Sequence, residues 1–134
     1  MPSAALRRLA VGYFVAQGLG VLAWWVLLFS VPDTRRLFTA AGAPDSVLLA
    51  FVLGDVVLVG LGSIGVAAGI SRRAEWAWPL LLVHAGAAMF GGAYCVILPL
   101  VAAGSGLLAA VAMIPVLIVP VAFAVLLRPR STES

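Results

Sequence analysis

Charge is scarce in this chain: only 10% of its 134 residues are charged, against about a quarter in a typical soluble domain. Apolar residues make up 64% of the sequence. A soluble domain of this length buries only about two-thirds of its surface, so the remaining apolar residues would form larger exposed patches than soluble monomers carry. The composition therefore favours an all-α integral membrane protein, with the bilayer as its solvent.

Lysine is absent, and all eight basic residues are arginines that occur in pairs near the ends of apolar runs. The pairs are Arg7/Arg8, Arg35/Arg36, Arg72/Arg73 and Arg128/Arg130. A nucleic-acid reader needs a basic face interleaved with aromatic residues, and the chain has no such stripe. We interpret the net charge of +3 as membrane anchoring and expect no nucleic-acid partner.

Metal-ligating residues are also few, because the chain has one cysteine and one histidine. This set cannot form an internal disulfide or a clustered zinc or iron site within one chain. The sequence also lacks a glycine-rich phosphate loop and a paired-cysteine redox motif. We therefore expect neither a metal nor a cofactor.

Four long apolar runs are present, each long enough to cross a bilayer. The expected spans are residues 9–31, 47–70, 76–101 and 107–127, with an interfacial loop at 32–46 and a tail at 128–134. The short turn Gly104-Ser105-Gly106 makes the last two spans antiparallel neighbours. The sequence thus predicts one transmembrane domain over residues 1–134, an up-down bundle of four helices with short loops.

The arginine pairs predict the orientation of this bundle. With four spans, six arginines lie on the side of the termini and two lie on the other side. The positive-inside rule then places both termini in the cytoplasm. The expected location is the bacterial inner membrane, crossed several times.

Polar groups inside the spans need an explanation, since a centred Asp costs about 2.5–3.5 kcal/mol on insertion scales. Gln17 and His84 lie at nearly the same expected depth, so direct contact between them is expected. Asp55 lies in the opposite half, about 10 Å from His84 along the membrane normal. Tyr94 is closer to Asp55 in depth, which favours a hydrogen bond between these two side chains.

Helical spacing groups these residues into stripes on three spans. The stripes are Tyr13, Gln17, Gly20 and Trp24 on the first span; Asp55, Leu58, Gly62, Gly65 and Gly69 on the second; and His84, Ala88, Gly91 and Cys95 on the third. The glycines on the second span predict a groove that another helix can approach closely. The three stripes are consistent with one interior site.

We weigh three functional hypotheses. In the first, the interior binds a membrane lipid or lipidic small molecule and can cyclise or isomerise it by proton donation. The catalytic candidates are then Asp55, His84 and Tyr94, and the ligand-binding candidates are Tyr13, Gln17, Trp24 and Cys95. In the second, an oligomer forms a proton-coupled transporter or channel with Asp55 as the coupling group. In the third, the glycine-rich faces bind another copy or a membrane partner, and the polar residues serve packing alone.

Overall fold

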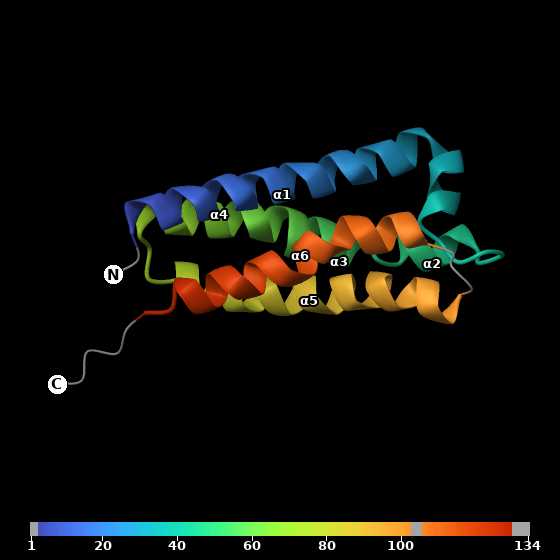
Figure 1. Ribbon diagram of the computed structural model, residues 1–134. Coiled ribbons are helices and arrows are strands. Elements are labelled where there is room, and N and C mark those ends of the chain that lie inside the picture. Colours follow the sequence, from blue (N-terminus) through green and yellow to red (C-terminus); the bar gives the residue numbers. More distant parts are fainter. Residues whose placement is uncertain (1–2, 103–105, 130–134) are drawn as a thin grey trace.

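The computed structural model describes residues 3–102 and 106–129, and every regular element in these ranges is a helix (Figure 1). Four of its helical segments are long and apolar enough to cross a membrane, which confirms the four expected helices. Their bounds are Ala4–Ser30, Asp45–Arg72, Ala77–Val101 and Leu107–Leu126. The central residues of the expected Gly104-Ser105-Gly106 turn lie outside the described ranges.

Three of the spans are single α-helices, whereas the second is composite. The single helices are α1 (Ala4–Ser30), α5 (Ala77–Val101) and α6 (Leu107–Leu126). The second span consists of α2 (Asp45–Leu49), α3 (Val52–Gly54), the π-helix η2 (Asp55–Leu61) and α4 (Gly62–Arg72). Its helical geometry therefore changes part-way along, at Asp55.

The first span begins earlier than residue 9, the start expected from hydropathy. The reason is an N-cap: the backbone N–H of Leu6 donates to Ser3 Oγ at 3.1 Å. This bond satisfies one of the N–H groups that the first helical turn leaves unpaired. Arg7 and Arg8 consequently belong to α1 and do not precede it.

The helices pack as two pairs joined through the middle of the molecule. α1 packs against α4 and η2, α6 packs along α5, and α4 packs against α5. Ala4 of α1 and Leu126 of α6 lie at the same end of the bundle (Figure 1), which we call the terminal end. The opposite end, where α2 lies, is called the loop end.

Glycines allow close approach between the packed helices. A Cβ atom at Gly18 of α1 would lie 2.8 Å from the carbonyl oxygen of Gly60. A Cβ atom at Gly69 of α4 would lie 3.1 Å from the Cα atom of Ala77. The expected glycine groove on the second span is therefore present, and α5 occupies its α4 part.

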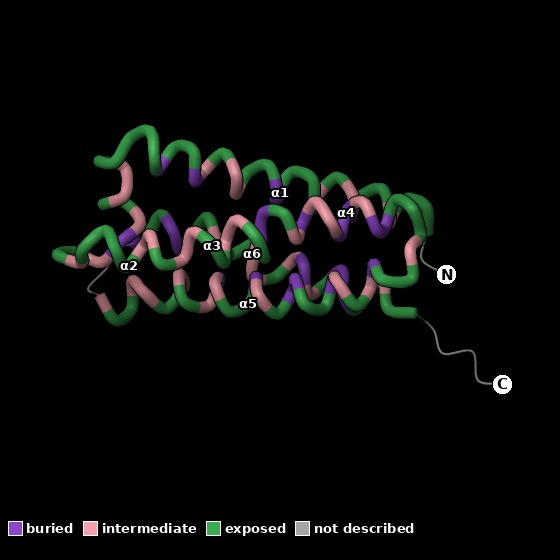
Figure 2. Tube along the Cα trace, turned by 180° about the vertical axis from the view of Figure 1, so that it is seen from behind, coloured by how far each residue is buried: buried purple, intermediate pink, exposed green. Residues whose placement is uncertain are grey.

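Packing is uneven along the bundle (Figure 2). One core cluster lies at the terminal end and consists of Ala10, Phe14, Val66, Ala67, Ile70, Ala77, Leu81, Ala85, Phe123 and Ala124. At the loop end, neither α2 nor α3 contains a buried residue, and α5 has none after Gly92. The bundle is thus packed more closely in the terminal half. In the loop half, buried residues come mainly from α1 and α6, such as Trp25, Leu28 and Ala109.

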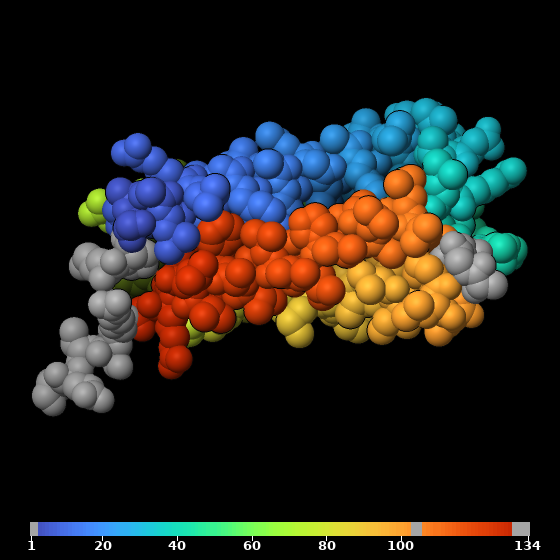
Figure 3. Space-filling view, in the orientation of Figure 1, coloured from blue at the N-terminus to red at the C-terminus, as the bar shows by residue number. Residues whose placement is uncertain are grey.

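Contacts of Arg35 hold the connection between α1 and α2 together at the loop end. The 3₁₀ helix η1 (Pro32–Leu37) follows α1, and its Arg35 donates through Nε to the carbonyl of Leu28 at 2.9 Å. Arg35 also forms an ion pair with Asp45, the first residue of α2, at 2.9 Å. Asp33 and Asp45 lie in the first turns of η1 and α2, and neither helix has a side-chain cap hydrogen bond. In the space-filling view, this segment lies against the loop ends of α1 and α6 (Figure 3).

Candidate functional site

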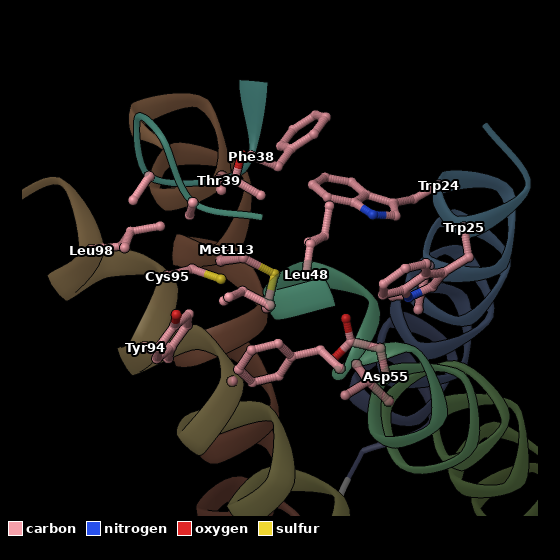
Figure 4. A pocket seen from close by; sticks show the side chains of 18 residues that line it. Trp24, Trp25, Phe38, Thr39, Leu48, Asp55, Tyr94, Cys95, Leu98 and Met113 are labelled. Atoms are coloured by element: carbon pink, nitrogen blue, oxygen red, sulfur yellow. The ribbon is translucent and has the colours of Figure 1, made fainter. Parts of the chain in front are cut away.

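A cavity of about 100 Å³ lies in the loop-end half of the bundle (Figure 4). Its wall is formed by α1, by the segment after η1, by the second span from α2 to η2, by α5 and by α6. Most of the lining is aliphatic or aromatic. The residues that line it include Trp24, Trp25, Asp55, Tyr94, Cys95 and Met113.

Two polar groups face this cavity from adjoining elements. Trp25 of α1 is only 2% exposed, and its buried Nε1 has no hydrogen-bond partner among residues 3–102 and 106–129. Asp55 of η2 lies near the Trp25 indole, although the two do not meet hydrogen-bond geometry. In Figure 4 the indole nitrogen and the carboxyl group are on the same side of the cavity. An unpaired buried donor costs about 1–3 kcal/mol, so this N–H is available to a ligand that can accept from it.

The π-helix explains why Asp55 faces Trp25. An α-helix advances by about 100° per residue, so a seven-residue spacing would align Asp55 with Gly62. Each π-turn includes an extra residue and therefore rotates the residues before it by about 100° relative to those after it. Asp55 begins η2, so it is turned away from the glycine groove of α4.

Tyr94 lines the same cavity but is not bonded to Asp55. Its ring lies beside that of Phe51, with ring centroids 4.9 Å apart. No hydrogen bond joins Tyr94 to Asp55 in the described part of the chain, so the expected pairing is not formed. Phe51 also lines the cavity.

A second polar cluster, the His84 cluster, lies outside the cavity. His84 is 1% exposed, and its Nδ1 lies 3.0 Å from the carbonyl oxygen of Leu58. A carbonyl can only accept, so Nδ1 carries the proton and Nε2 accepts. Gln17 Nε2 lies 3.4 Å from His84 Nε2 and is the donor, because an amide nitrogen donates. Ser63 Oγ also lies 3.4 Å from His84 Nε2, and its hydroxyl donates to the carbonyl of Val59 at 2.6 Å. The expected contact between Gln17 and His84 is confirmed.

Gly62 and the π-helix together make room for this histidine. A Cβ atom at Gly62 would lie 3.2 Å from His84 Nδ1, so a larger residue would press on the ring. Leu58, whose carbonyl accepts from the ring, belongs to η2. The arrangement satisfies the imidazole inside the bundle without contact with the cavity.

Tyr13 also lies apart from the cavity. Its hydroxyl donates to the carbonyl of Pro115 at 2.9 Å and so ties α1 to α6. Its ring packs beside Phe14 and Phe123. The structure therefore gathers Asp55, Tyr94, Trp24 and Cys95 around one cavity and places Gln17, His84 and Tyr13 elsewhere.

Trp25 and Met113 are cavity residues that sequence reasoning missed. Trp25 follows Trp24 directly, and helical spacing gave only Trp24 a place on the polar stripe. Met113 is in an expected span without ionisable groups, and nothing in its sequence context distinguishes it from the surrounding apolar residues. One signal in the sequence was usable. Successive helical positions face directions about 100° apart, so two adjacent tryptophans can line neighbouring parts of one wall.

Comparison of the chain with protein-family models, curated proteins and solved structures found no match. Within residues 3–102 and 106–129, no three His, Cys, Asp or Glu side chains are grouped as metal ligands.

Proposed function

We propose that this chain is a multi-pass protein of the bacterial inner membrane, with both termini in the cytoplasm, that binds a lipidic small molecule in the loop-end cavity. One observation carries the proposal: an apolar cavity holds a buried, unpaired N–H group beside a carboxyl group. Small-molecule sites are typically apolar with a few placed polar groups, and this wall has that composition.

The size of the cavity limits what it encloses. An engineered apolar cavity of about 150 Å³ binds benzene. A cavity of about 100 Å³ therefore accommodates a small ring or the end of a chain, with the rest of a longer ligand outside. The apolar surroundings, which include Met113, favour hydrocarbon.

Proton transfer to the bound molecule is the reaction that this wall supports best. The Asp55 carboxyl can deliver a proton to a ligand held beside it, in a site partly shielded from water. Such a step would start the cyclisation or isomerisation of an unsaturated substrate. His84 is engaged in its own cluster and Tyr94 does not contact Asp55, so Asp55 alone has a supported catalytic position.

Filling the cavity tests the proposal. Gly91 lines the cavity, and a Cβ atom there would meet nothing within 4 Å. Gly86 lies on the same helix, is equally open, and is not part of the cavity wall. Gly91→Leu should therefore fill the cavity, whereas Gly86→Leu serves as the matched control.

Native mass spectrometry of the gently extracted protein provides the measurement. We expect wild type and Gly86→Leu to retain a discrete small molecule and Gly91→Leu to lose it. A second comparison with Asp55→Asn should change the occupancy of that molecule. If all four proteins carry only bulk phospholipid, the cavity is not a ligand site and the polar residues serve packing.

A further inference from the structure

Trp25 and Asp55, two of the polar residues in the cavity wall, make different demands on a ligand. The Trp25 Nε1–H group can only donate a hydrogen bond. The ionised Asp55 carboxyl can only accept one, and its protonated form can do both. The structure shows no hydrogen bond between these two groups in the described part of the chain, so a single ligand group that reaches both can pair with each.

Common polar groups of lipidic molecules meet these demands to different extents. A carbonyl accepts from Trp25 but leaves an ionised Asp55 unpaired, and it pairs with both groups only when the carboxyl is protonated. An ammonium group donates to Asp55 but leaves the indole N–H unpaired. A hydroxyl group accepts from Trp25 and donates to Asp55, and its oxygen can also accept from a protonated carboxyl.

We infer that the cavity selects an apolar alcohol, whose hydroxyl accepts from Trp25 Nε1–H and donates to the carboxyl group of Asp55. This inference rests on the proposed function and adds the chemical class of the ligand. The apolar end of the alcohol lies among Trp24, Met113 and Cys95, which continue the cavity wall away from the two polar groups.

Three probes with the same hydrocarbon chain separate the alternatives. Farnesol carries a hydroxyl, farnesal carries an acceptor-only aldehyde, and farnesylamine carries an ammonium. The chain has no lysine side chain to trap the aldehyde. Each probe is titrated separately into the full-length protein in lipid nanodiscs, and native mass spectrometry gives the bound fraction. We expect farnesol to bind about tenfold more tightly than either of the others, since one buried hydrogen bond distinguishes each pair.

Two variants remove, one at a time, the two protein groups that would bind the hydroxyl. In Asp55→Leu, farnesol should lose its advantage over farnesal, because both then accept only from Trp25. In Trp25→Phe, farnesol should lose its advantage over farnesylamine, because both then donate only to Asp55. These ratios are measured within each folded variant, so a general loss of stability does not produce them.

Trp78→Phe provides the matched control. The Trp78 indole donates to the carbonyl of Ala124 at 3.1 Å, away from the cavity, so all three affinities should keep their wild-type ratios. If farnesylamine binds the wild type most tightly, the site is a cation site and the inference is wrong. Equal binding of farnesol and farnesal overturns it as well. If no probe binds, the proposed function itself fails.

Discussion

At the residue scale, the main polar residues serve two separate purposes. Gln17 and His84 contact each other inside the packed part of the bundle, where interhelical hydrogen bonds replace water, and Gln17 Oε1 has no partner among the described residues. Trp25 lines a cavity, and its Nε1–H has no hydrogen-bond partner among the described residues. Unpaired buried groups are costly in a low-dielectric interior. The Trp25 donor points to a ligand because it borders a cavity, whereas Gln17 and His84 do not line that cavity and serve packing.

The contact between Gln17 and His84 predicts a non-additive response to mutation. Gln17→Leu and His84→Leu should each be destabilising, because each leaves a buried partner unpaired. The double variant should be more stable than the sum of the two losses indicates, by about 0.6–2 kcal/mol, the range seen for hydrogen bonds between membrane helices. Unfolding in SDS titrations measures these free energies.

Strict additivity of the two losses would contradict this interpretation of the His84 cluster. Ser63→Ala provides a further check within the cluster. The Ser63 hydroxyl donates to Val59 at 2.6 Å and lies 3.4 Å from His84 Nε2, so its removal should leave Gln17 as the remaining side-chain partner of that nitrogen and should keep the coupling between Gln17 and His84.

At the element scale, close packing of α1 against the second span depends on Gly18. In Gly18→Ala, the new Cβ atom would lie 2.8 Å from the backbone oxygen of Gly60, which cannot move independently of its helix. We expect a loss of about 1–3 kcal/mol in the free energy of unfolding. Gly20→Ala on the same helix meets nothing within 4 Å and should be neutral or stabilising by up to about 1 kcal/mol.

The same SDS titration compares the two alanine variants. Equal stabilities would show that α1 and the second span are not in close contact at Gly18. A loss confined to Gly18→Ala would confirm this contact, because both substitutions change helix propensity in the same way.

The sequence predicted the four helices and the contact between Gln17 and His84, because hydropathy and the rise per residue determine both. The sequence did not predict which way the Asp55 side chain faces. Helical-wheel reasoning assumes a constant turn angle, and the π-helix that begins at Asp55 departs from that angle. The sequence also could not predict that the Trp25 N–H lacks a partner, because hydrogen bonds between helices depend on how the helices pack.

At the scale of the whole molecule, orientation in the membrane is the first property to measure. Asp33 lies at the loop end and Glu75 at the terminal end, and both are exposed. In a Cys95→Ser background, a membrane-impermeant maleimide applied to intact cells should label Asp33→Cys and not Glu75→Cys. The arginine distribution is the physical reason for this expectation.

The converse labelling pattern would place the termini outside and reverse the orientation that we propose. Permeabilised cells give the control, because both cysteines should then react. Such a reversal would leave the cavity geometry unchanged but would place the cavity in the opposite leaflet.

The uneven packing also gives the two halves of the bundle different compressibilities. Close-packed protein interiors yield little to pressure, whereas voids are the volume that pressure removes. The terminal half, with Phe14 and Leu81 fully enclosed, behaves as the rigid part. Hydrostatic pressure therefore acts first on the half around Asp55, where helices can move inward before any contact in the core changes.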